Sequence, residues 1–385
     1  MSYMARRVQH YGTTIFTEMT NLANEYGAVN LGQGFPNFGA PDFVKEAARA
    51  AIAADINQYP PAIGRTRLRN ALAAKYANHY GMEIDPASQI VAMHGATECL
   101  FATIQSLVDP GDEVIIFEPY FDTYVPCVEF AGGTPVFYTL EPPDWTIDLD
   151  RLAALFSDKT KLILINTPHN PTGKVFGREE LTLIADLCQK HDVIALSDEV
   201  YEHIVFDDAQ HVPIATLDGM ADRTVTISSI GKSFSVTGWK VGWAIGSAEL
   251  CTAIFRSHQW ITFAGAAPLE EASGAALEWA DETGYYDDLR QMYQRKRDVL
   301  GDALNAAGLP VIQPKGTYFA MVDISQLGHA DDRAFCDYLT KEVGVTPIPP
   351  SFFYTTPNAG TTLARFAFCK TDEAIAEAAR RLQAA

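Results

Sequence analysis

The sequence predicts an α/β fold, in which a mostly parallel central sheet is covered by helices and a smaller α+β domain follows. Between about residues 45 and 245, short and continuously apolar runs recur, as expected for strands buried on both faces. Amphipathic stretches separate several of these runs, and alternation of strand and helix favours parallel pairing. After about residue 278 the pattern changes, which predicts the smaller domain.

Seven apolar runs predict the strands of the large sheet. In chain order they are IVAMHG, DEVIIFEP, TPVFYTL, KLILINTP, DVIALSDE, TVTISSI and VGWAIGS. Two intervening helices are the clearest in the sequence. One is ATECLFATIQSLV, which ends at Asp109-Pro110-Gly111, a set of ordinary helix stop signals, and the other is GREELTLIADLCQKHD.

The chain after the sheet predicts a second, smaller domain. A charged amphipathic segment at about 278–307 predicts one helix that links the two domains. Strand-like TYFAMVDI, the helical pattern DDRAFCDYLTKEVG, strand-like LARFAF and a C-terminal helix follow, which is typical of an α+β domain. We therefore expect an N-terminal arm at 1–44 that contributes to the small domain and the site, a large domain at 45–285 and a small domain at 286–385.

Composition excludes several classes of function. A length of 385 residues suits one large domain plus a smaller one, and the net charge of −19 argues against nucleic acid as a partner. The six cysteines form no C-x-x-C pair, which favours buried thiols in a reducing cytoplasm over disulfides or a metal site. Neither a signal peptide pattern nor an apolar run of roughly 20 residues is present, so we expect a cytoplasmic protein without a membrane partner.

Reactive side chains follow four of the predicted strands. Ligands of an open parallel sheet bind beyond the carboxyl ends of its strands, so these side chains are expected to meet at one site. They are His94, Gly95, Ala96 and Thr97 after IVAM, Asn166 and Asn170 after LILI, Asp198 and Tyr201 after VIAL, and Ser228, Ser229 and Lys232 after TVTI.

The turn at 95–97 offers an anion site. It presents backbone N–H groups, a hydroxyl and a helix N-terminus, which together favour a phosphate. Ser229 and Lys240 add a hydroxyl and a cation to the same site. The alternative, an ordinary connection between strand and helix, is equally compatible with the turn taken alone.

Lys232 and Asp198 favour a covalent cofactor with a protonated ring. Small neighbours and a nearby second cation lower the pKa of a lysine, as a Schiff-base lysine requires. The alternative for Lys232 is a solvated surface lysine, which its position directly after a buried strand disfavours. Asp198 closes an apolar run, and a pyridinium nitrogen would pair with its carboxylate. A helix N-cap remains the alternative for Asp198, while Tyr201 and Asn170 could reach the phenolic oxygen of such a ring.

Six ordered motifs resemble the class I/II aminotransferases of pyridoxal phosphate fold type I. They are GATECL, EPYFDTY, NTPHNPTGK, SDEVYEHI, SSIGKSFSVTGWKVGW and LARFAF, and the similarity runs from GTTIFTEM to the last helix. LGQGFPNF and NQYPPAIG are typical of the subgroup that contains kynurenine aminotransferases, glutamine transaminase K and bacterial methionine aminotransferases.

The resemblance implies a role for each site residue. It implies that Lys232 forms the aldimine with pyridoxal 5'-phosphate and moves the proton between Cα and the cofactor carbon. Asp198 would hold the pyridine nitrogen, and Tyr201 and Asn170 the ring oxygen. The other implied cofactor-binding residues are Phe121, which stacks on the ring, Asn166 beside it, and Gly95, Ala96, Thr97, Ser229, Lys240 and Tyr59 of the partner subunit for the phosphate.

The substrate pocket is also implied by the resemblance. Arg365 would bind the α-carboxylate as a bidentate fork, with help from Asn170 and the backbone of Gly34. Phe16 would line the side-chain pocket together with Tyr59 and Phe263 from the partner subunit. Shared active sites require at least a homodimer.

Two positions depart from the pattern of the broad family. Lys240 stands where most members have Arg, so a point charge replaces a fork, as is common in this subgroup. Glu270 stands where relatives usually have Gln, and its effect on pocket or packing stays open.

The expected activity is ping-pong transamination from a neutral L-amino acid (aromatic, sulfur-containing or aliphatic) to a 2-oxo acid. No second arginine fork for a distal carboxylate is evident, which disfavours aspartate as donor. The alternative on the same scaffold is β-elimination from cysteine S-conjugates. A non-catalytic regulator is disfavoured because no helix-turn-helix precedes the sheet, and a nicotinamide dehydrogenase because no G-x-G-x-x-G follows an early strand.

Overall fold

A computed structural model describes residues 3–384. Its centre is a seven-stranded sheet in the order β2-β8-β7-β6-β5-β3-β4, in which β8 alone runs antiparallel to its neighbours. The predicted α/β fold with a mostly parallel sheet is therefore confirmed, and each of the seven apolar runs forms one strand. The strands are β2 Ile90–Met93, β3 Glu113–Glu118, β4 Thr134–Thr139, β5 Thr160–Asn166, β6 Ile194–Asp198, β7 Thr224–Ser229 and β8 Gly242–Ile245.

Helices cover both faces of this sheet because alternate residues of each strand point to opposite sides. In β3, Val114 and Ile116 pack toward α4, α5 and α9, whereas Ile115 and Phe117 pack toward α6 and α7. Strands β2 and β8 bury their second face against α3 and α10. These helices are α3 Thr66–Tyr80, α4 Gly95–Leu107, α5 Tyr124–Ala131, α6 Leu149–Ala153, α7 Arg178–His191, α9 Ala248–Ile261 and α10 Ala267–Thr283.

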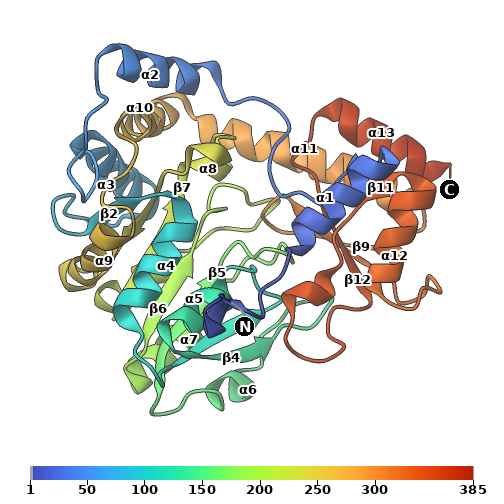
Figure 1. The fold of residues 1–385 in the computed structure, drawn as a ribbon, viewed down its shortest axis with the longest axis horizontal. Coiled ribbons are helices and arrows are strands. Elements are labelled where there is room, and N and C mark those ends of the chain that lie inside the picture. Colours follow the sequence, from blue (N-terminus) through green and yellow to red (C-terminus); the bar gives the residue numbers. More distant parts are fainter. Residues whose placement is uncertain (1–2, 385) are drawn as a thin grey trace.

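A second region is built from segments near both ends of the chain (Figure 1). It contains a three-stranded antiparallel sheet of β9 Val311–Ile312, β10 Phe319–Asp323 and β12 Leu363–Ala367. Near the N-terminus, β1 Val29–Asn30 pairs with β11 Val345–Thr346, which places early residues beside late ones. The helices around it are α1 Ile15–Tyr26, α11 Tyr285–Ala306, α12 Asp332–Tyr338 and α13 Asp372–Gln383, while α2 Asp42–Ala53 packs on α10.

The prediction of a single helix over 278–307 is wrong. The chain forms two helices, α10 and α11, which are separated at Gly284. Gly284 adopts φ +69°, and its N–H donates to the carbonyl of Ala280, which is the usual left-handed end of a helix. The helix predicted over 331–344 likewise ends its α-helical part at Tyr338, and a π-turn at Leu339–Val343 completes the segment.

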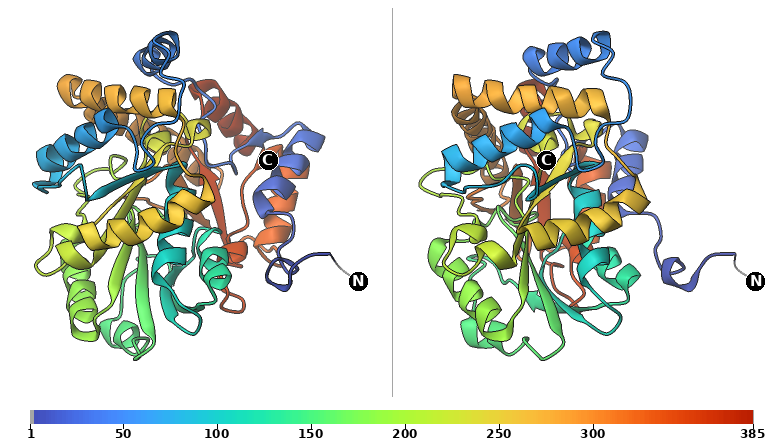
Figure 2. Two further views of the ribbon diagram at one scale, coloured as in Figure 1. Left: turned by 60° about the vertical axis from the view of Figure 1, so that its left-hand side comes forward. Right: turned by 90° about the vertical axis from the view of Figure 1, so that its left-hand side faces the viewer.

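The described residues that precede α1, from residue 3 onward, extend away from the body of the molecule in both views of Figure 2. All six cysteines are buried free thiols, as the sequence predicts. Within residues 3–384, no helix has the length and apolarity needed to span a membrane, and no cluster of His, Cys, Asp and Glu side chains is arranged to hold a metal ion.

Candidate active site

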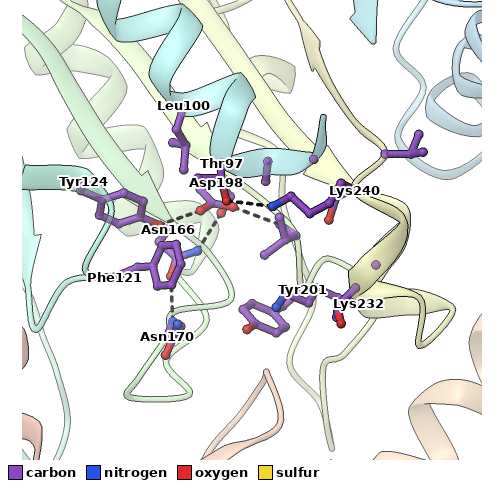
Figure 3. Close-up of a pocket in the computed structure, with 17 residues that line it drawn as sticks. Thr97, Leu100, Phe121, Tyr124, Asn166, Asn170, Asp198, Tyr201, Lys232 and Lys240 are labelled. Carbon is purple, nitrogen blue, oxygen red and sulfur yellow. Dashed lines mark hydrogen bonds between the residues drawn. The ribbon is translucent and has the colours of Figure 1, made fainter. Parts of the chain in front are cut away.

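The predicted site residues meet at the carboxyl ends of the central strands (Figure 3). One cavity is lined by eleven of them: Gly95, Ala96, Thr97, Phe121, Asn166, Asn170, Asp198, Tyr201, Ser229, Lys232 and Lys240. An adjoining cavity is lined by Phe16, Gly34 and Arg365, and it shares Phe121, Asn170, Tyr201 and Lys232 with the first. Side chains far apart in sequence therefore open on one continuous space.

Asp198 ends β6 at the floor of the first cavity. Its side chain is buried, and burial raises its pKa to about 6 even though the Tyr124 hydroxyl donates a hydrogen bond to it at 2.7 Å. A protonated ring nitrogen would supply the cation that this buried carboxylate lacks. Sequence reasoning missed Tyr124, although it lies in the EPYFDTY motif three residues after Phe121.

Lys232 enters the same space from the short helix α8, Ile230–Ser233, which directly follows β7. Burial lowers the pKa of its ammonium group, and the charges of Lys240 and Arg365 act in the same direction. Its Nζ lies 5.6 Å from the ring centre of Tyr201 and 5.9 Å from that of Tyr318. A lysine with a lowered pKa is a better nucleophile toward a carbonyl carbon.

The predicted phosphate end is formed by the first turn of α4. Gly95 adopts φ +72°, and a Cβ on Gly242 would lie 2.6 Å from the Gly95 carbonyl carbon, so both positions require glycine. The exposed Lys240 points its Nζ toward the Thr97 hydroxyl at 3.4 Å (Figure 3). Free N–H groups at the helix start, a hydroxyl and a cation suit an anion here.

A buried network behind this turn escaped sequence reasoning. Glu98 accepts hydrogen bonds from the backbone N–H of His94 at 2.6 Å, from Thr262 Oγ1 at 2.6 Å and from His258 Nδ1 at 2.7 Å. Burial raises the pKa of Glu98, but these hydrogen bonds outweigh burial and hold it well below its usual range. His258 Nε2 faces the Ala62 carbonyl at 3.0 Å, so both ring nitrogens of this fully buried histidine face acceptors.

The predicted carboxylate end centres on Arg365 in β12. Its guanidinium is 1% exposed, and burial lowers its pKa to about 10, which leaves it charged near neutral pH. Nη1 donates to Asn170 Oδ1 at 3.0 Å and Nη2 donates to the Gly32 carbonyl at 2.8 Å. Its Nε is buried and lacks a protein partner among the described residues. An incoming carboxylate would satisfy this donor.

The loop between β5 and α7 connects this end to the floor of the cavity. Asn166 Nδ2 donates to the Asp198 carbonyl at 2.9 Å, and its Oδ1 accepts from the Asn170 N–H at 2.7 Å. Asn170 then meets Arg365. The two asparagines predicted for the site therefore join strands β5 and β6 to β12.

Aromatic rings surround Arg365. Its Cζ lies 4.1 Å from the ring centre of Phe319 and 5.2 Å from those of Phe16 and Phe353. Phe16 was predicted, whereas Phe319 and Phe353 were not, because single aromatic residues are more often core than pocket. The rings exclude water from the guanidinium, and the lower dielectric strengthens its attraction for a carboxylate.

Tyr59 and Phe263 are not brought to the site of their own chain. They line neither cavity and are 84% and 52% exposed, with their ring centres 5.5 Å apart. Glu270 is buried and accepts from the Arg65 N–H at 2.9 Å, while its Oε1 has no partner among residues 3–384. Burial raises the Glu270 pKa.

The arrangement fits pyridoxal 5'-phosphate at three separate points. Among residues 3–384 the buried carboxylate of Asp198 has no cation within ion-pair distance, Lys232 is an amine of lowered pKa, and the Gly95 turn brings the start of α4 so close to Lys240 that a Cβ would lie 3.3 Å from its Cε. Such a donor set can hold a ring nitrogen, a carbonyl carbon and a phosphate at once.

Comparison with known proteins agrees with this geometry. Residues 26–382 match the model of the family described as aminotransferase class I and II. The chain is 43% identical to a kynurenine–oxoglutarate transaminase of Dictyostelium discoideum over 96% of this chain and 93% of that protein. It is 42% identical to a probable N-succinyldiaminopimelate aminotransferase of Mycobacterium tuberculosis, over 98% and 97% of the two chains. The solved structure of YbdL from Escherichia coli, described as having a methionine aminotransferase function, superposes with a TM-score of 0.96 at 38% identity and covers 100% of both chains.

Proposed function

The chain belongs to the class I and II aminotransferases, and from that premise we propose that it transfers the amino group of a neutral L-amino acid to a 2-oxo acid. As a member of this family it is a transaminase that uses pyridoxal 5'-phosphate. The choice of a neutral substrate rests on one observation. Among the described residues that line the two cavities, Arg365 is the one arginine, and aromatic rings surround it.

We assign the residues of the site as follows. Arg365 binds the α-carboxylate with Asn170 and the backbone of Gly34, and Phe16 lines the side-chain pocket. Asp198 holds the pyridine nitrogen, and Tyr201 and Asn170 hold the ring oxygen. The phosphate is held by Gly95, Ala96, Thr97, Ser229 and Lys240, while Phe121 and Asn166 lie against the ring. Burial of Asp198 and Arg365, and the opening of all these side chains on one space, support the assignment.

Each of these groups has a task in a ping-pong reaction. When bound, the cofactor supplies the carbonyl carbon that takes the amino group and a ring that withdraws electrons from the Cα–H bond. Asp198 keeps the ring nitrogen protonated, which needs a carboxylate rather than a carboxylic acid. With the cofactor bound, Lys232 would be the base that moves the proton between Cα of the substrate and the cofactor carbon. Arg365 fixes Cα in front of this amine, and the surrounding rings exclude water.

We also propose a homodimer with shared active sites. Tyr59 and Phe263 lie together on the surface, next to Trp260 at 85% exposure and Ile261 at 40%. Four large apolar side chains exposed together on the surface are typical of an interaction surface. A second copy would cover it and receive Tyr59 at its phosphate and Phe263 at its side-chain pocket. The division of the chain at 1–44, 45–285 and 286–385, and a cytoplasmic location, remain predictions from the sequence.

A set of half-reactions tests the proposed substrate class. Purified protein loaded with pyridoxal 5'-phosphate is mixed with one amino acid and no 2-oxo acid, and the released 2-oxo acid is counted per active site. The donors are methionine, phenylalanine, glutamine, kynurenine, aspartate and N-succinyldiaminopimelate. We expect about one equivalent from the neutral donors and little from the two with a distal carboxylate, because an unpaired carboxylate is costly to bury in an aromatic pocket.

A cysteine S-conjugate serves as the contrasting substrate. The relatives compared above are named transaminases, which does not favour the β-lyase alternative. If the S-conjugate alone reacts and releases pyruvate over many turnovers, the proposed transamination is wrong. If aspartate reacts as well as methionine, the substrate class is wrong while transamination stands.

A further inference from the structure

The loop at 32–35 is held to the rest of the protein through its carbonyl groups. Four successive carbonyl oxygens each accept a hydrogen bond from a side chain of the C-terminal quarter of the chain. The bonds are Arg365 Nη2 to Gly32 at 2.8 Å, Lys370 Nζ to Gln33 at 2.9 Å, Tyr318 Oη to Gly34 at 2.6 Å and Lys370 Nζ to Phe35 at 3.0 Å. Two of the three donors are therefore cations.

Lys370 is an unusual member of this set. Its side chain is buried at 4% exposure, and its Nζ donates to two neutral carbonyls. No carboxylate lies within ion-pair distance of its Nζ among residues 3–384, whereas the other buried lysines Lys75 and Lys296 each pair with one. A buried ammonium without an anion is costly, so its presence calls for a compensating negative charge.

The position of Lys370 shows where that charge would come from. Gln33, Gly34 and Phe35 line the same cavity as Arg365, so the loop that Lys370 holds forms part of its wall. Burial lowers the pKa of Lys370, and the charge of Arg365 adds to this effect, so the two cations act on each other. The Nε of Arg365 is a second buried donor without an acceptor. Both observations indicate an anion in this cavity.

The backbone of the loop packs closely against the carboxylate site. A Cβ on Gly34 would lie 2.6 Å from Phe319 Cζ, so the backbone lies directly against that ring. The N–H groups of Gly32 and Gln33 donate to Asn30 Oδ1 at 2.9 Å and 3.2 Å, which fixes the start of the loop. The loop would drift from Phe319 and Arg365 if the ammonium were lost.

We propose that Lys370 is a positioning residue for the substrate carboxylate, one that holds loop 32–35 against Arg365 and adds a second positive charge to the carboxylate site. This inference rests on the proposed function, because it takes the α-carboxylate of an amino acid or 2-oxo acid as the anion. Lys370 does not touch the substrate; it acts through the loop and through its electric field.

The alternative is that Lys370 only stabilises the fold. Lys296 provides a matched control, because it is also buried and its Nζ donates to the Lys370 carbonyl at 2.8 Å, but it pairs with Asp372 and lines neither cavity. A purely structural role predicts similar effects from the loss of either lysine. A role in carboxylate binding predicts an effect specific to Lys370 and to charged ligands.

The test compares two ligands that share the phenylpropyl skeleton but end in a carboxylate or in a neutral hydroxyl, 3-phenylpropanoate and 3-phenylpropan-1-ol. Their dissociation constants are measured by calorimetry on the cofactor-loaded protein at low and high salt. For Lys370→Met we expect about tenfold weaker binding of the carboxylate at low salt and an unchanged affinity for the alcohol. KM for methionine should rise by a similar factor while kcat changes by less than about threefold.

Two further variants keep the proposal testable if Lys370→Met folds poorly. Lys370→Arg retains the charge and should keep most of the carboxylate affinity, whereas Lys370→Gln retains a donor without charge and should lose it. Equal losses for carboxylate and alcohol, or the same loss in Lys296→Met, would overturn the proposal. If the wild-type protein transaminates no neutral amino acid, the proposed function fails instead, and these two results are distinguishable.

Discussion

The two ends of the site are built differently. The phosphate end is formed largely by one strand–helix turn, in which Gly95 and Thr97 are neighbours in sequence and Lys240 is exposed. The carboxylate end is assembled from loop 32–35, Asn170 and Arg365, and its arginine is 1% exposed. One end therefore depends on local backbone geometry, and the other depends on contacts across more than 300 residues of chain.

This difference has an energetic consequence. An anion at the phosphate end is shared among backbone N–H groups and partly hydrated cations, so each contributes modestly. At the carboxylate end a few buried charge-assisted hydrogen bonds bind the anion. Loss of one of them leaves other buried groups without partners. Single substitutions should therefore have larger effects at the carboxylate end.

Lys232 lies between the two ends, and its loss should have the largest effect. We expect Lys232→Ala to lower turnover by roughly 10⁴-fold or more, because the amine that moves the substrate proton is gone. Both ends should still bind their anions. Borohydride treatment followed by mass spectrometry should find no cofactor attached to the variant, whereas Lys240→Ala should retain the adduct. Full turnover in Lys232→Ala would show that Lys232 is not the amine that moves the proton.

Arg365→Ala should have the next largest effect and probes the carboxylate end directly. Each lost charge-assisted bond is worth about 1.5–3 kcal/mol, and the effect should raise KM for every amino acid alike. Steady-state kinetics with methionine, phenylalanine and glutamine measure it. An increase confined to one donor would mean that Arg365 contacts the side chain rather than the α-carboxylate.

Asp198 lies between the two ends of the site, and its pKa gives a test based on pH. Its folded pKa of about 6 exceeds the ordinary aspartate value of 3.8, so the folded apoprotein holds this proton more tightly than the unfolded chain. Its contribution to stability is therefore present below about pH 4 and lost as pH rises to about 6, by up to about 3 kcal/mol. Asp198→Asn should remove that loss.

Urea unfolding of the apoprotein at pH 4 to 8 measures this effect. The exposed Asp302→Asn serves as the control and should leave the pH profile unchanged. A variant Asp198→Asn that follows the wild-type profile would show that the carboxyl of Asp198 does not titrate as its burial predicts.

Glu98→Gln tests the phosphate end and should have the smallest effect of the four. The amide keeps an acceptor for His94 and Thr262 but no longer pairs with the buried, doubly hydrogen-bonded His258. We expect a loss of about 1–3 kcal/mol in the free energy of unfolding and weaker cofactor binding, with KM for amino acids nearly unchanged. Cofactor titration and urea unfolding measure the two effects.

A second His–Glu pair provides the matched control for that variant. Glu129 contacts His10 at 3.0 Å on the surface, so Glu129→Gln should cost less than about 1 kcal/mol. If Glu98→Gln raises KM for amino acids as much as Arg365→Ala does, the two ends are not independent and the comparison fails.

The sequence by itself predicted the sheet and most of the residues that line the cavity at its edge. Seven apolar runs correspond to seven strands, and the residues after them, such as Asp198 and Lys232, line one cavity. This worked because parallel strands are buried on both faces and their carboxyl ends share an edge, so pattern and position are both local properties. The order of six motifs and their family resemblance added Arg365 and Phe16.

Only the tertiary structure decided the rest. The break at Gly284 is hidden because the residues on both sides keep a helical pattern. Tyr124, His258 and Lys370 gain their roles from partners 74, 160 and 337 residues away, as in Lys370 with Gln33. A charge pattern along the chain does not reveal such partners, because the cost of burying a lysine or a histidine depends on what packs around it in three dimensions.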